Sequence, residues 1–177
     1  MSASPQIWDH FLSDELGSNL LRWFEADSDW TKTEGKVFVY DRLTLGNREV
    51  PDDCRAILSS KFVLAIKTLA EKCAAKPLST KYRLMAHRLV QGQGIGLHTD
   101  EARPGVVFNV FINREWREEF GGYLILFRSA NNSDISAVIA PLHNRAVAIP
   151  VHKTSFHAVS DVFSGTRFAL SYFFSAL

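Results

Sequence analysis

The sequence contains no run of about 20 apolar residues, which is the length that a membrane-spanning helix needs. Its first residues also lack a charged segment followed by an apolar stretch, the pattern of a secretory signal peptide. Twenty basic residues against nineteen acidic ones leave a net charge of +1, and no dense run of Lys or Arg is present. A nucleic-acid contact normally needs such a basic patch. We therefore expect a cytoplasmic protein whose partners include neither nucleic acid nor a membrane.

Cysteine is scarce as well, with only Cys54 and Cys73 in the chain. Two cysteines are too few for a disulfide framework, and both fall in a segment with helical spacing, where reduced and buried thiols are the ordinary state. The 177 residues are 46% hydrophobic, which is enough to bury a substantial core. We expect a single domain over residues 1–177, with a helical support region over 1–80 and a β-rich core over 82–175.

The first third of the chain has the spacing of amphipathic helices. Ser13 is a suitable N-cap, because an acidic first turn follows it. The apolar residues of this first helix recur at helical spacing: Leu16, Leu20, Leu21 and Phe24. A second and longer helix is predicted from Pro51 to Cys73, packed on the outside of a sheet. Between the helices, residues 36–45 alternate enough for one or two strands.

From residue 82 onward the pattern changes to short extended runs separated by turn residues. The predicted strands are 82–90, 106–112, 123–127, 137–139, 146–150, 156–159 and 167–174, together with the short segment that carries His98 and Asp100. Eight short strands at this even spacing predict a mainly β fold of the α+β kind, in which two antiparallel sheets face each other as a jelly roll. The interior of such a fold can hold a metal ion and a small ligand.

Two histidines and one aspartate have the spacing of a metal centre. His98 and Asp100 stand at positions i and i+2, so an extended backbone points both side chains to the same face. With His157 from a strand that is distant in sequence, they form the 2-His-1-carboxylate set of a non-haem Fe(II) site. Three protein ligands leave coordination positions open for a co-substrate and dioxygen. We therefore predict that these three residues bind a catalytic metal.

Four parts of the second half carry a family resemblance. They are Phe111–Trp116 (FINREW), Gly121–Leu126 (GGYLIL), Phe156–Val159 (FHAV) and Arg167. Their order and spacing resemble the Fe(II)/2-oxoglutarate-dependent oxygenases of the prolyl 4-hydroxylase type, over roughly residues 85–174. The resemblance implies a double-stranded β-helix, a jelly-roll or cupin-like core, with the N-terminal helices packed on one sheet. It also implies that His98, Asp100 and His157 are iron ligands.

The same resemblance implies the reaction, the cofactors and the kind of substrate. The enzyme would be a dioxygenase that uses Fe(II), 2-oxoglutarate and O2, with ascorbate in support. It would hydroxylate an unactivated C–H bond of an amino-acid or peptidyl substrate, prolyl residues included, and release succinate and CO2. Relatives that halogenate replace the carboxylate ligand with a small residue, so the carboxylate of Asp100 favours hydroxylation. Peptides, free amino acids and other small molecules all stay open as substrates.

Arg167 begins a predicted strand and is expected to pair with the distal carboxylate of 2-oxoglutarate. A planar guanidinium presents two parallel donors that fit a carboxylate. On an extended backbone Arg167 and Ser171 face the same way, so Ser171 could share that carboxylate. An arginine that faces a core is very costly without a counter-ion, so its position predicts an anion in the cavity.

Two places at which relatives carry a tyrosine that hydrogen-bonds 2-oxoglutarate hold Leu89 and Phe111 here. Neither side chain can donate a hydrogen bond. Asn109, and after it His87, fall on the predicted inner faces of their strands and are the expected replacements. Arg103 comes soon after the ligand pair; it is either an ordinary loop residue or a contact to substrate, and the sequence favours neither reading.

Two other functions fit part of the pattern. A cupin-like hydrolase or isomerase could hold another divalent metal at the same ligands, but hydrolysis needs no buried clamp for a dicarboxylate. A non-catalytic module that binds 2-oxoglutarate would not need the complete set of metal ligands. Neither alternative explains Arg167 and the metal ligands together, so a 2-oxoglutarate-dependent hydroxylase is the leading hypothesis.

Overall fold

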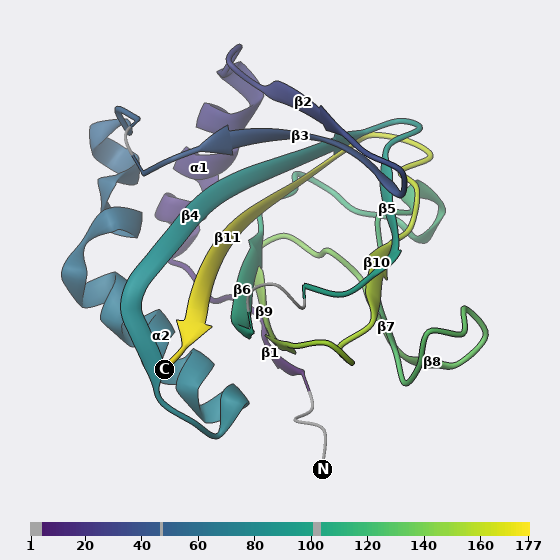
Figure 1. Cartoon of the computed structure of the whole chain (residues 1–177). Helices are drawn as coiled ribbons and strands as arrows, with labels where there is room; N and C mark the ends of the chain where they lie inside the picture. The colour runs from purple at the N-terminus through teal and green to yellow at the C-terminus, as the bar shows by residue number, and fades with distance from the viewer. Residues whose placement is uncertain (1–4, 47, 101–103) are drawn as a thin grey trace.

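The computed structural model describes residues 5–46, 48–100 and 104–177. In this part of the chain eleven strands form one curled antiparallel sheet, and two α-helices cover one of its outer faces (Figure 1). The strands are β1 (Gln6–Trp8), β2 (Thr31–Glu34), β3 (Phe38–Thr44), β4 (Leu78–Val90), β5 (Gly94–His98), β6 (Gly105–Phe111), β7 (Leu124–Phe127), β8 (Ile135–Ile139), β9 (Arg145–Val151), β10 (His157–Val159) and β11 (Thr166–Ala176). The helices are α1 (Asp14–Ala26) and α2 (Ser60–Ala74), with two short 3-10 helices, η1 (Asp52–Leu58) and η2 (Glu118–Phe120).

The sheet order is β1-β9-β6-β11-β4-β3-β5-β10-β7-β8, and β2 pairs with β3 outside this path. The sheet bends between β3 and β5, which share only a short pairing. The helix-covered wall, from β1 to β3, thereby faces the opposite wall, from β5 to β8 (Figure 1). This is the predicted double-stranded β-helix, and the eight strands predicted from residue 82 onward are present as β4 to β11.

The first helix, α1, begins where the sequence predicts. Ser13 is its N-cap, and the side-chain oxygen of Ser13 accepts a hydrogen bond from the backbone N–H of Leu16 at 3.3 Å. Leu20 and Phe24 on the inner side of this helix are fully buried. No helix in the described ranges has both the length and the apolar content that crossing a membrane requires.

The predicted helix from Pro51 to Cys73 is wrong in one respect, because the structure divides it into η1 and α2. Ser59, between them, has an extended backbone with ψ 139°. Its hydroxyl accepts a hydrogen bond from the N–H of Phe62, so Ser59 caps α2 instead of continuing a helix. The strands β1 and β2 were not predicted, since runs of three and four residues are too short to show a period.

Strand alternation assigns the residues of the helix-covered wall to two cores. In β6, Phe108 and Val110 face outward and pack in the cluster that includes both helices, whereas Phe111 faces the interior of the barrel. In β11, Tyr172 is on the helical side and its hydroxyl donates to the backbone oxygen of Ile57 at 2.8 Å. Full burial of a side chain such as Phe108 contributes about 1.5–3 kcal/mol to the free energy of unfolding. The helices close the outer face of this wall, and its inner face lines a cavity.

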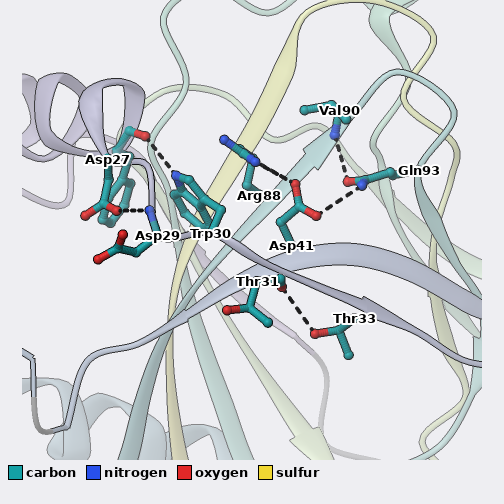
Figure 2. Close-up of polar contacts among 10 residues, drawn as sticks. Asp27, Asp29, Trp30, Thr31, Thr33, Asp41, Arg88, Val90 and Gln93 are labelled. Atoms are coloured by element: carbon teal, nitrogen blue, oxygen red, sulfur yellow. Dashed lines mark hydrogen bonds and ion pairs between the residues drawn. The ribbon is translucent and has the colours of Figure 1, made fainter.

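A buried ion pair joins β3 to β4 near the bend of the sheet, as Figure 2 shows. Asp41 is 6% exposed, and its carboxylate accepts from Nε of Arg88 at 3.0 Å and from Nη2 at 2.8 Å. The other oxygen of Asp41 accepts from the amide of Gln93 at 3.3 Å, and Gln93 Oε1 accepts from the N–H of Val90 at 3.0 Å. The guanidinium of Arg88 also lies 5.0 Å from the ring centre of Trp30.

The same network holds the turn between β4 and β5. The backbone N–H of Gly92 donates to the backbone oxygen of Val162, and the backbone N–H of Val162 donates to the backbone oxygen of Gln93, both at 2.9 Å. Gly92 has φ of +81°, a conformation that glycine adopts without steric cost. Because β5 follows this turn directly, the network contributes to the placement of His98, the last residue of β5.

We expect Asp41→Ala to lower the free energy of unfolding by about 2–4 kcal/mol, because it leaves the guanidinium of Arg88 and the amide of Gln93 without their acceptor. Urea denaturation measures this change. Asp29→Ala is the matched control, since Asp29 forms an exposed ion pair with Arg48 whose loss costs under about 1 kcal/mol. Equal losses in the two variants would contradict the structural role of the Asp41 network.

Candidate metal centre

The three predicted metal ligands lie together on the opposite wall. His98 ends β5, His157 begins β10, and the two residues are direct partners in the antiparallel pairing of these strands. One ligand atom from each of His98, Asp100 and His157 lies within 4.8 Å of the others, and Nε2 of His157 is 3.7 Å from Oδ2 of Asp100. The predicted placement of Asp100 on the strand is wrong by a small margin, because β5 ends at His98 and Asp100 follows it.

Each of the two imidazoles is oriented by a hydrogen bond of the same kind, from its Nδ1 to a backbone oxygen two residues earlier. Nδ1 of His98 lies 2.9 Å from the backbone oxygen of Gly96, and Nδ1 of His157 lies 2.9 Å from that of Ser155. A carbonyl oxygen only accepts, so Nδ1 carries the proton of each neutral ring. Each Nε2 then carries a free lone pair, and this tautomer of histidine can bind a metal through Nε2.

The charge of the set also suits a divalent cation. Burial lowers the pKa of His157, which keeps its imidazole neutral at pH 7 and available as a ligand. His157 is 7% exposed, whereas Asp100 is more open to solvent. Two imidazoles with one carboxylate are the donors of a non-haem Fe(II) site, and the residues present therefore fit that ion.

A cavity of about 220 Å³ opens beside these side chains, between the two walls. The helix-covered wall lines it with inward residues of β3, β4, β6 and β11: Phe38, Tyr40, His87, Leu89, Val107, Asn109, Arg167, Ala169, Ser171 and Phe173. The structure thus brings His87, Asn109, Arg167 and Ser171 to the same cavity as the metal ligands. The remaining predicted site residue, Arg103, lies outside the described residues.

Arg167 places a buried cation in this cavity. Its side chain is almost inaccessible to solvent, its Nε donates to the backbone oxygen of Gly122 at 2.8 Å, and its guanidinium lies 4.8 Å from the ring centre of Phe111. Burial lowers the pKa of Arg167 to about 10, which still leaves the guanidinium charged at neutral pH. No carboxylate in the described part of the chain pairs with it. A side chain at position 122 would crowd Arg167, since a Cβ there would be 2.9 Å from Cδ.

Three polar side chains of the helix-covered wall form a chain of hydrogen bonds along the cavity. The hydroxyl of Ser171 donates to Oδ1 of Asn109 at 2.7 Å, and Nδ1 of His87 lies 3.1 Å from the oxygen of Ser171. Because the proton of Ser171 is directed to Asn109, Nδ1 of His87 carries a proton and donates to Ser171. Burial, and after it the charge of Arg167, lowers the pKa of His87 to about 4, so the ring is neutral at pH 7.

The two positions at which the resemblance implies a tyrosine are apolar and fully buried. Leu89 is the register partner of Arg167, and Phe111 lies beside the guanidinium. Tyr40 lines the cavity from β3, and its ring centre is 5.3 Å from that of His87, a placement that the sequence analysis missed. Alternation within β3 shows which residues share a face, but only the pairing of β3 with β4 and β5 brings that face to the cavity.

The fold is similar to those of solved prolyl hydroxylases. A prolyl hydroxylase from Trichoplax adhaerens, in complex with a hypoxia inducible factor oxygen degradation domain peptide fragment, matches with a TM-score of 0.78 at 16% identity, over 98% of this chain and 84% of that one. A prolyl-4-hydroxylase from Pseudomonas putida matches with a TM-score of 0.75 at 16% identity, over 100% of this chain and 94% of that one. The viral collagen prolyl hydroxylase of Paramecium Bursaria Chlorella virus-1, as its 2-oxoglutarate complex, matches with a TM-score of 0.67 at 15% identity, over 98% and 96%. At these identities the likeness establishes the fold.

The sequence of the core shows the family. No curated protein sequence matches this chain. The family model of the 2OG-Fe(II) oxygenase superfamily, however, matches residues 84–175, slightly more than half of the chain. That range contains the three metal-ligand candidates and the buried arginine. The chain therefore belongs to the 2OG-Fe(II) oxygenase superfamily.

Proposed function

We propose that His98, Asp100 and His157 hold Fe(II), that Arg167 anchors 2-oxoglutarate, and that the enzyme hydroxylates an unactivated C–H bond of an amino-acid or peptidyl substrate. As a member of its superfamily the chain is a 2-oxoglutarate-dependent dioxygenase that uses Fe(II), 2-oxoglutarate and O2. A prolyl residue is the first candidate target, because the solved proteins of similar fold are prolyl hydroxylases. The observation that carries the proposal is a buried guanidinium that lies in the same cavity as the three ligands and pairs with no carboxylate of the described residues.

The metal centre is prepared by its own hydrogen bonds. The carbonyls of Gly96 and Ser155 fix the tautomers of the two imidazoles, so their lone pairs face the carboxylate of Asp100 without a further proton transfer. Fe(II) bound here would activate O2, and 2-oxoglutarate would supply two electrons as it is decarboxylated to succinate and CO2. The protein's share is to bind and orient the reactants and to exclude water.

Arg167 supplies the charge that holds the co-substrate. Its Nε is used by Gly122, which fixes the plane of the guanidinium and leaves the two terminal nitrogens for a carboxylate. A buried cation without a counter-ion is unfavourable, so a dicarboxylate in the cavity gains both the ion pair and the relief of that cost. Neither the hydrolase nor the isomerase alternative gives this arginine a role.

Asn109 is the proposed replacement for the tyrosine of relatives. The hydrogen-bond chain from His87 through Ser171 ends on Oδ1 of Asn109 and so turns its amide N–H groups away from Ser171. These N–H groups have no partner among the described residues and are available to an anionic ligand in the cavity. His87 acts through the chain, as a positioning residue whose neutral state keeps the direction of the hydrogen bonds.

Two further properties are proposed on structural grounds. The 177 residues form one domain, because β1 and β3 from the N-terminal part pair with the core strands β9, β4 and β5. The cytoplasm is the proposed location, because Cys54 and Cys73 are buried and form no disulfide in the described part of the chain.

Anaerobic addition of Fe(II) and 2-oxoglutarate to the apo-protein is expected to give the weak visible charge-transfer band of a keto acid chelated to ferrous iron. The band should fade when O2 is admitted. His98→Ala and Asp100→Ala are expected to lose both metal binding and the band, since each removes one of three ligands. Iron binding without the band would place the hydrolase or isomerase alternative ahead of the oxygenase.

Arg167→Met is expected to weaken 2-oxoglutarate binding roughly 10- to 100-fold, the loss of about 1.5–3 kcal/mol that accompanies removal of a charged hydrogen bond. Binding of Fe(II) should stay unchanged, because Arg167 is not a ligand. Calorimetric titration of each ligand separates the two effects. Arg117→Met, at an exposed arginine that pairs with Glu115, is the matched control and should bind 2-oxoglutarate as the wild type does.

The neutral state of His87 predicts a pH-dependent loss of stability in the apo-protein. Its pKa falls from an ordinary 6.5 to about 4 on folding, so the unfolded chain binds the extra proton and stability decreases as the pH falls through that window. At about 1.4 kcal/mol per pKa unit the loss is about 3 kcal/mol between pH 7 and pH 4. Urea denaturation over this pH range should show this loss of stability in the wild type and not in His87→Gln. His10→Asn, at an exposed histidine, should retain it.

A further inference from the structure

A second hollow, of about 420 Å³, opens next to the metal centre. It lies between the β7–β8 hairpin and the segment that links β9 to β10, and its walls include Leu126, Phe127, Ser136 and Phe156. Ile149 and His157 line both this hollow and the cavity of Arg167. The two spaces therefore meet at the metal centre.

The hollow and Arg167 lie on different sides of the metal centre. Arg167 contacts the backbone of Gly122, whereas the hollow begins at Leu126, four residues further along the chain and inside β7. His157 is the register partner of Leu126, so the metal centre stands at the boundary. If 2-oxoglutarate occupies the side of Arg167, a substrate has to approach from the side of the hollow.

The walls of the hollow indicate the chemistry of its occupant. Apolar residues form slightly more than half of the lining, His152, Thr154 and Ser155 are among its polar residues, and no Asp or Glu of the described residues lines it. Arg128 donates to Oδ1 of Asp134 at 3.2 Å and to the backbone oxygen of Ile135 at 2.8 Å, so its charge is already compensated. A volume of about 420 Å³ falls in the range of roughly 300–1,000 Å³ that binds drug-sized ligands. An uncharged ligand larger than a single amino acid fits these walls.

Beside the hollow, β8 offers an unpaired strand edge. Among the described residues, β8 is the last strand of the sheet and pairs with β7 alone. Its sequence, Ile135–Ile139, contains neither a charged residue nor a proline, the features that usually protect such an edge, and Ile135 and Val138 are 42% and 54% exposed. An extended peptide can add to an edge of this kind through main-chain hydrogen bonds.

We propose that the hollow and the edge of β8 together bind an extended, uncharged segment of a peptide substrate, whose target residue passes Ile149 and His157 to reach the metal centre. The proposal rests on the proposed function for the role of the metal centre, and it deepens that function by naming a peptide in place of a free amino acid. The hollow holds the residues that flank the target. The strand edge sets their direction.

The test blocks the hollow after folding, with Ser136→Cys as the attachment point. Ser136 is exposed on β8 and lines the hollow. The native thiols do not compete, because Cys54 and Cys73 are buried and burial raises the pKa of Cys54 to about 12. A bulky methanethiosulfonate reagent modifies the new thiol, and a reducing agent removes the group again. Leu64→Cys, on the exposed side of α2, is the matched control.

Binding of a panel of short, blocked, uncharged peptides that contain proline is measured by saturation-transfer NMR, with Zn(II) in place of Fe(II) and with 2-oxoglutarate present. Modified Ser136→Cys is expected to bind the peptides roughly tenfold more weakly or worse, a change of about 1.4 kcal/mol, and reduction restores binding. Its affinity for 2-oxoglutarate is expected to stay unchanged. Peptides with methylated backbone nitrogens should also bind more weakly, because they have no N–H groups to donate to the carbonyl oxygens of the β8 edge.

Unchanged peptide binding by modified Ser136→Cys would overturn the proposal, and so would free proline that binds as tightly as the peptides. Binding of 2-oxoglutarate with no peptide bound by the wild type also overturns it, while the oxygenase function stands. A third outcome separates the two proposals. If the protein binds no 2-oxoglutarate but binds peptides, and if the modification removes that binding, the peptide site is supported and the proposed function is contradicted.

Discussion

The two-residue period of β11 is the constraint on which the architecture depends. One face of this strand packs Leu170 and Tyr172 against the helical side, and the other presents Arg167 and Ser171 to the interior. The helices cover the outer face, and the residues of the inner face line the cavity. A buried guanidinium is costly without an anion beside it, so the packing of one face of β11 favours an anionic ligand at the other face.

The opposite wall must be held in register for the metal ligands to meet. His98 ends one short strand, Asp100 follows it by two residues, and His157 starts another strand, so a displacement of either strand by one residue would separate the ligands. The Asp41 network and the bonds between the β4–β5 turn and Val162 restrain this part of the sheet. The tautomers of the two imidazoles then follow from carbonyls two residues earlier on each segment, so the orientation of the lone pairs needs no distant residue.

The proposed sites follow one another along the barrel interior. Arg167 stands at one end, the metal centre in the middle, and the hollow beside β8 beyond it. This order lets a co-substrate and a substrate approach one metal from two sides without competing for space. Inside this frame Leu89 and Phe111 offer no hydrogen-bond donor, and the chain of hydrogen bonds that ends at Asn109 is the proposed replacement.

Sequence by itself determined the parts that depend on local spacing. The eight core strands, the N-cap at Ser13 and the shared face of Arg167 and Ser171 follow from periods of two and 3.6 residues, which any short segment displays. Tertiary structure alone decided the break at Ser59, the pairing that brings Tyr40 into the cavity, and the hollow beside β8. The reason is physical: a period states which side chains share a face, whereas the neighbour of that face is chosen by contacts between segments far apart in the chain.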